Sequence, residues 1–115
     1  MTLKTYSLVN AVERNRRTPD TFEIPSQTER HGLCVGDRVK LGFVWTDRRR
    51  TFGAPGAERM WVLITRVGDG VYFGTLDNIP ADPFAAVDHG GVVAFAPEHV
   101  FDILPTLAAC LAKYP

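Results

Sequence analysis

Two β-rich runs in the middle of the chain, residues 60–67 and 71–76, flank a short glycine and aspartate turn at 68–70. A Gly/Asp cluster between apolar runs is typical of a β-hairpin. The first run is apolar on both faces along most of its length, which predicts a central strand covered on both sides. We therefore expect Trp61 and Ile64 to be buried and the rest of the chain to be organised around this hairpin.

Further strands are expected on either side of the hairpin. In residues 33–44, apolar Val39, Leu41 and Phe43 alternate with charged or small residues, which predicts a strand with one solvated face. Residues 90–95 repeat the pattern of a glycine turn followed by apolar residues two apart. Short strands, glycine-rich turns and few helices together predict an α+β, mostly β fold: a small, partly open antiparallel barrel of SH3-like size.

Two helices are expected beside these strands. Ser26 and Glu29 have the spacing of a capping box, and a glycine stop follows, so the pattern predicts a short helix near residues 26–31. Asp102 is a suitable N-cap, and leucine and alanine recur after it at helical spacing. This predicts a C-terminal helix over about residues 103–113.

The length of the chain favours a single domain over residues 1–115. Within it, we expect a core barrel over about residues 22–102, preceded by an N-terminal segment 1–21. In that segment, residues 6–12 fit a short strand or a helix equally well. Residues 13–20 are polar and arginine-rich and predict an exposed turn or loop.

Composition is that of an ordinary soluble domain, with 45% hydrophobic and 23% charged residues. No apolar run approaches the roughly 20 residues that span a bilayer, and the first residues lack the apolar core of a signal peptide. Cys34 and Cys110 have no paired spacing and lie in apolar contexts, so we expect buried free thiols in a reducing compartment. These features favour a cytoplasmic protein without a membrane partner.

The formal net charge is zero, but the charges are unevenly distributed. Residues 1–66 hold 12 Lys/Arg and 7 Asp/Glu, whereas residues 67–115 hold 1 and 6. Such asymmetry can mark two different binding faces. It also fits complementary surfaces of one compact fold, which is the interpretation we favour.

Candidate chemistry is sparse. His31, His89 and His99 do not form the i, i+4 pair of a helical zinc site, and Cys-x-x-Cys is absent, so we expect neither a metal nor a cofactor. The serines carry no nucleophile-elbow motif, and the aspartates flank turns, where carboxylates bond the local backbone. The sequence therefore predicts a non-enzymatic protein. A weaker alternative is a small-ligand or hydrolytic site near Asp77, Asn78 and His99, with His89.

The conspicuous charge cluster is Arg48, Arg49 and Arg50, within a long loop at residues 46–58 that follows Trp45. Basic residues interleaved with aromatics can hold single-stranded nucleic acid by charge and stacking. However, the domain has no net positive charge and no RNA-binding motif. An acidic protein surface is as good a partner for this loop, and a merely solvated loop is the simpler alternative.

Several motifs resemble a known bacterial family. They are residues 58–62 (Glu-Arg-Met-Trp-Val), 69–80, and 95–100 (Phe-Ala-Pro-Glu-His-Val), with residues 22–26 and 36–41. Together they resemble a bacterial domain family of unknown function that contains YegJ-like proteins and is related to domains found among toxin-immunity proteins. The similarity covers roughly Phe22 to Asp102. The arginine-rich loop is longer than the family pattern implies.

The resemblance implies a non-enzymatic protein-binding module, of the immunity or accessory type, that masks another bacterial protein such as a toxin or effector. The alternative is a nucleic-acid-binding small barrel that uses the arginine-rich loop at 47–50. Aromatic and arginine side chains dominate interface energies, which selects the loop and one nearby turn as the candidate partner-binding surface. Its residues are Trp45, Arg48, Arg49, Arg50, Asp77, Asn78 and Pro80.

If the arginine-rich loop is an exposed binding element, Arg49→Ala should leave the melting temperature unchanged, because surface substitutions away from packed features rarely change stability. Thermal denaturation of the variant beside the unaltered protein measures this. A large drop in melting temperature would mean that the loop is structural.

Overall fold

The computed structural model describes residues 6–46, 56–82 and 85–104. The arginine-rich cluster at 48–50 and residues 105–113 lie outside the described residues. In chain order the elements are β1 (Tyr6–Leu8), α1 (Ala11–Arg17), α2 (Gln27–His31), β2 (Arg38–Trp45), β3 (Ala57–Val67), β4 (Tyr72–Leu76), β5 (Val92–Phe95), the 3-10 turn η1 (Pro97–His99) and β6 (Asp102–Leu104).

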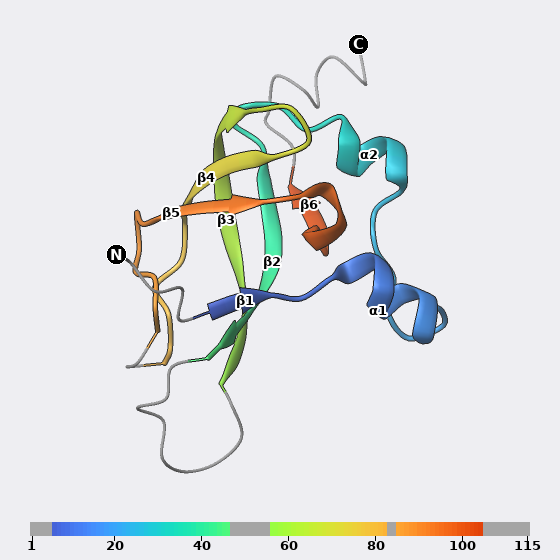
Figure 1. Ribbon diagram of the computed structural model, residues 1–115, viewed down its shortest axis with the longest axis horizontal. Coiled ribbons are helices and arrows are strands. Elements are labelled where there is room, and N and C mark those ends of the chain that lie inside the picture. The colour runs from blue at the N-terminus through green and yellow to red at the C-terminus, as the bar shows by residue number, and fades with distance from the viewer. Residues whose placement is uncertain (1–5, 47–55, 83–84, 105–115) are drawn as a thin grey trace.

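All six strands belong to one antiparallel sheet that curls into a partly open barrel (Figure 1). Strands β2 to β5 form a meander, in which each strand pairs with the next along the chain. After β5 the chain makes the turn η1, and β6 then pairs with the start of β2. Strand β1 pairs with the end of β2. This confirms the predicted fold class of a small, mostly β, antiparallel barrel with short helices.

The predicted central hairpin is present as β3 and β4, but its two faces are unequal. Met60, Val62 and Ile64 point inward and are buried, whereas Trp61 and Leu63 lie half-buried on the outer face. The prediction that both faces are covered is therefore wrong. A single curled sheet encloses only its inner side, and no second layer in the described part of the chain covers the outer side of β3.

Aromatic side chains cluster where β1 pairs with the end of β2. Trp45 is 1% exposed and stacks on Phe43 with ring centroids 5.8 Å apart. Tyr6 from β1 contacts both rings, at 5.4 Å and 6.2 Å, and burial raises the pKa of its hydroxyl. The Trp45 indole Nε1–H donates to Glu58 Oε2 at 3.2 Å. Trp45 therefore belongs to the core, and its prediction as a surface anchor is wrong.

The helix predicted near 26–31 is confirmed as α2. Ser26 Oγ accepts from the Glu29 amide at 3.1 Å, and Glu29 Oε1 accepts from the Ser26 amide at 3.0 Å, which completes the predicted capping box. The loop predicted over 13–20 is partly wrong, because Ala11–Arg17 forms α1. Asn10 caps that helix by accepting from the Glu13 amide at 2.9 Å. The loop prediction followed the polar composition of residues 13–20 and overlooked this N-cap.

The barrel extends beyond the predicted limits of 22–102 at both ends. Strand β1 lies within the N-terminal segment, where the sequence pattern fitted a strand and a helix equally well. Asp102 begins β6 and does not cap a helix, because residues 102–104 find backbone partners on β2.

Cys34 is exposed, contrary to the prediction of a buried thiol, since it lies in the turn that leads into β2. Within the described ranges, no helix is long and apolar enough to cross a bilayer.

Trp45→Ala should lower the free energy of unfolding by about 3–5 kcal/mol, because it empties a buried aromatic position. The matched change Trp61→Ala should cost less than about half as much, since Trp61 is half-buried on the outer face and its loss leaves no internal cavity. Urea denaturation followed by circular dichroism measures both values. Equal losses would show that the outer face contributes to stability as strongly as the core does.

Candidate functional site

The residues predicted to form a partner-binding surface do not form one cluster among the described residues. Arg48, Arg49 and Arg50 lie outside the described part of the chain, and Trp45 is buried. The remaining three residues, Asp77, Asn78 and Pro80, belong to the turn that follows β4.

That turn is held by its own side chains. Asp77 Oδ2 accepts from Arg38 Nε at 2.7 Å, an ion pair whose side chains are 37% and 43% exposed. Asn78 Oδ1 accepts from the backbone amide of Trp61 at 2.6 Å. The turn is further secured by Glu58, whose carboxylate accepts from the amides of residues 81 and 82. Asn78 and Glu58 therefore shape the turn and join it to β3.

The hydrolytic alternative lacks a converging set of side chains. His89 precedes β5 and His99 follows it, so the two histidines lie at opposite ends of that strand. Asp77 and Asn78 follow β4, which places them at the His89 end. His99 Nδ1 accepts from the Ala96 amide at 3.0 Å, within the turn η1. Among the residues that the structure describes, no three His, Cys, Asp or Glu side chains are grouped to hold a metal ion.

A groove with a volume of about 530 Å³ lies away from the predicted site residues, between the extended segment that follows α1 and the outer face of the barrel. We call it the Arg59 groove. Its position beside β2, β3 and β6 follows from the register, since Lys40 faces Asp102 on one side and Trp61 on the other. The groove is lined by Thr21, Phe22, Glu23, Ile24, Pro25, Glu29, Lys40, Arg59, Phe101, Asp102 and Ile103.

A glycine in β2 makes room for the aromatic wall of this groove. Gly42 pairs with Arg59 across the β2–β3 ladder. A Cβ atom at Gly42 would lie 2.9 Å from the ring of Phe101 and 3.2 Å from Val9. Because Gly42 lacks that atom, Phe101 packs directly over the strand and beside Arg59.

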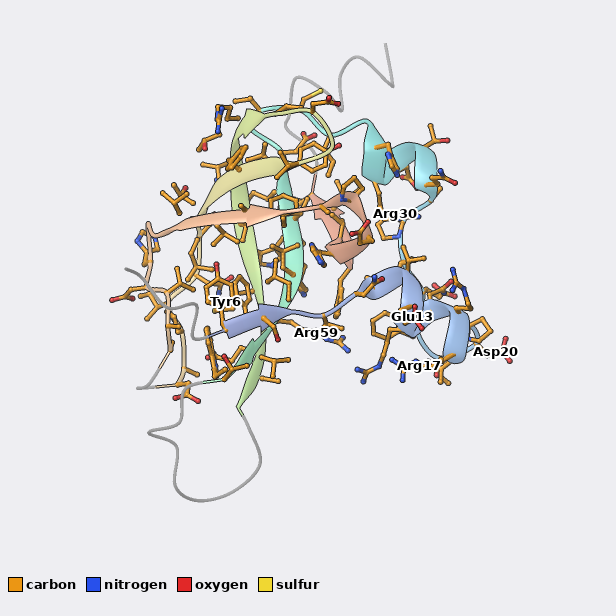
Figure 2. All side chains as sticks on the ribbon, viewed as in Figure 1. Tyr6, Glu13, Arg17, Asp20, Arg30 and Arg59 are labelled. Carbon is orange, nitrogen blue, oxygen red and sulfur yellow. The ribbon has the colours of Figure 1, made fainter. Side chains whose placement is uncertain are left out.

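Arg59 is oriented by two aromatic rings. Its guanidinium carbon lies 5.4 Å from the ring centroid of Phe22 and 5.0 Å from that of Phe101, and the two rings meet edge to face at 5.0 Å. Arg14 of α1 approaches the same Phe22 ring at 5.7 Å. Figure 2 shows Arg59 between the sheet and α1. Arg59 also lines a second cavity, of about 180 Å³, on the other side of Phe101.

No acceptor engages the Arg59 guanidinium among the residues that the structure describes: its recorded interactions there are the two ring contacts. Lys40 adds a second cation to the groove and lies over the Trp61 ring, with Nζ 4.9 Å from its centroid. Two of the acidic residues that line the groove differ from these cations, because their carboxylates accept hydrogen bonds from backbone amides. Glu29 accepts from the Ser26 amide, and Asp102 accepts from the Ile103 amide.

A buried arginine fixes the wall of the groove that contains Pro25. Arg30 is 8% exposed, and its side chain donates from Nε to the Pro25 carbonyl at 3.0 Å and from Nη1 to the Pro97 carbonyl at 3.4 Å (Figure 2). Its own carbonyl accepts from the Tyr72 hydroxyl at 2.9 Å. These bonds join α2 to the turn η1 and to β4, so the groove wall at Pro25 is held on the barrel.

Sequence reasoning missed Arg59, Phe22 and Phe101 as a group. Arg59 and Trp61 alternate on the outer face of a recognised strand, which is the one local signal for this site. Phe22 and Phe101 come from distant segments, and their contacts with Arg59 depend on how β6 and the segment after α1 meet the sheet.

Comparisons with protein-family models, with curated proteins and with solved structures find no match to this chain.

Asn78→Ala should lower the free energy of unfolding by about 1–3 kcal/mol, because the Trp61 amide loses its acceptor. The neighbouring change Asp77→Asn should cost less than about 1 kcal/mol, since the ion pair it weakens is solvent-exposed. Chemical denaturation of both variants compares the two. The reverse order of losses would assign the structural role to Asp77.

Proposed function

We propose that this protein is a non-enzymatic protein-binding module and that the Arg59 groove is its principal partner-binding surface. The observation that carries the proposal is a guanidinium packed against both Phe22 and Phe101 at the wall of an open groove of about 530 Å³. Arginine and aromatic side chains are the usual anchors of protein interfaces. Anchors that are already oriented lose less conformational entropy when a partner binds.

The charge pattern favours a protein partner over nucleic acid. The groove holds Lys40 and Arg59, but Glu23, Glu29 and Asp102 also line it. A phosphate backbone would meet those carboxylates, and the whole chain has zero formal net charge. A mixed surface suits a protein partner, whose own charges can complement both signs.

The resemblance to the family of YegJ-like and immunity-related domains agrees with this class of function. On that reading, the protein is cytoplasmic and masks a second bacterial protein, such as a toxin or effector. The groove on the barrel supplies the contact surface, and the Asp77–Pro80 turn, which Asn78 joins to β3, is a second proposed contact. The arginine-rich loop at 48–50 remains a predicted additional contact.

Nucleic-acid binding is the second candidate, and one observation favours it. Four cations of the described residues lie over aromatic rings: Arg14, Lys40, Arg59 and Arg66. Such pairs occur on surfaces that stack bases and hold phosphates. Here the cations already occupy the ring faces, which leaves less aromatic surface for bases, so we rank this function below protein binding.

To test the proposal, the full chain is immobilised and exposed to extract of its native host, with and without nuclease. The double variant Lys40→Glu, Arg59→Glu should lose the captured protein, with a loss of about 2 kcal/mol or more in binding free energy. Arg66→Glu is the matched control, because Arg66 lies on the same strand, stacks on Phe73 at 4.0 Å and lines neither cavity described above. It should bind as the unaltered chain does.

Three results would contradict the proposal. The first is capture that the double variant retains in full, and the second is the absence of any captured protein. The third is capture that nuclease abolishes and whose affinity falls steeply with salt, which would assign the surface to nucleic acid.

A further inference from the structure

The Arg59 guanidinium is a donor group held in place without an acceptor among the described residues. Arg59 is exposed, and contacts with the nearly perpendicular rings of Phe22 and Phe101 limit where its guanidinium lies. Its N–H groups engage none of the described side chains or carbonyls. A guanidinium presents a planar fork of donors that matches a carboxylate in a bidentate pair. A carboxylate or a phosphate of a ligand would therefore complete this site.

We infer that the groove recognises an extended segment of a partner protein and that an Asp or Glu of that segment forms a bidentate pair with Arg59. This inference rests on the proposed protein-binding function and specifies its partner. It makes Arg59 the residue that determines specificity, with Lys40 as a supporting cation.

The shape of the groove supports an extended ligand. Residues 21–25 run along one wall without helical structure, and residues 101–103 run along the other, where β6 begins. Thr21 belongs to the turn after α1, and the four residues 22–25 that follow span at most roughly 13 Å at about 3.3 Å per residue. A groove of this length accommodates a segment of comparable length, and Arg59 contacts Phe22 near the start of the first wall.

The charges of the groove favour one acidic residue at a defined place and disfavour a polyanion. Arg14 approaches the same Phe22 ring as Arg59, and Lys40, which also lines the groove, lies over the Trp61 ring. Glu23, on the wall formed by residues 21–25, is exposed and would repel a second anion there. A segment that places an acidic residue at Arg59 and a neutral or basic residue near Glu23 complements the charges at both positions.

The test uses random heptapeptides displayed on phage and selected on three full-length proteins: the unaltered chain, Arg59→Gln and Arg66→Gln. Peptides from the unaltered chain and from Arg66→Gln should be enriched in Asp or Glu at one position, and those from Arg59→Gln should not. A selected peptide should bind Arg59→Gln about tenfold more weakly or worse, and Arg66→Gln within about twofold. Arg59→Lys should fall between, because it keeps the charge but loses the planar fork.

A double-mutant cycle then assigns the contact. Replacing the enriched acid of the peptide by its amide should weaken binding to the unaltered chain, yet have little further effect on Arg59→Gln. Cooperative thermal unfolding of each variant confirms that the compared proteins are folded.

The outcomes separate the two levels of the proposal. If the unaltered chain selects no peptides, an extended acidic segment is not the ligand, whereas the capture experiment above still decides whether the chain binds protein. If it selects peptides without an acidic preference, or with a preference that Arg59→Gln retains, protein binding stands and the role of Arg59 is overturned. Selection that dT oligonucleotide abolishes would assign the site to nucleic acid.

Discussion

Strand β2 is paired along both of its edges, and the rest of the structure depends on this constraint. One edge carries β3, from Arg38 to Val44. The other edge is divided between β6, at residues 38–40, and β1, at residues 43–45. Since β5 stays on β4 and only the turn η1 and three further residues separate it from β6, the sheet must curl for β6 to reach β2. That curl brings both ends of the described chain onto one barrel.

A curled sheet has one inner face, and this divides the side chains of each strand into two groups. Val39, Leu41 and Phe43 fill the inside with the alternate residues of β3 to β5. The outer face carries Lys40, Arg59 and Trp61. The apolar stems of Lys40 and Arg59 pack against aromatic rings, while their charged groups stay in water. The same division explains why β3 is buried on its inner face and only half-buried on its outer face.

The candidate site is built on rigid parts of this barrel. Gly42 admits Phe101 against β2, and Phe101 and Phe22 pack against Arg59. Arg30 fastens the Pro25 end of the wall that contains Phe22 by donating to two backbone carbonyls. None of the three histidines lines the groove. A surface made of oriented cations and aromatic rings on a fixed scaffold is suited to recognition, because binding then costs little conformational entropy.

The sequence alone determined the local features, because local chemistry suffices for them. The Ser26–Glu29 capping box, the turn at 68–70 and the alternation in β2 each follow from residues a few positions apart. Tertiary structure decided which apolar residues face inward, so that Trp45 is buried and Trp61 is not, although both lie in apolar runs. It also decided that Asp102 begins a strand and that Phe22, Arg59 and Phe101 meet. These outcomes depend on the curl of the sheet and on pairing between distant segments, and neither is encoded in any short stretch of the chain.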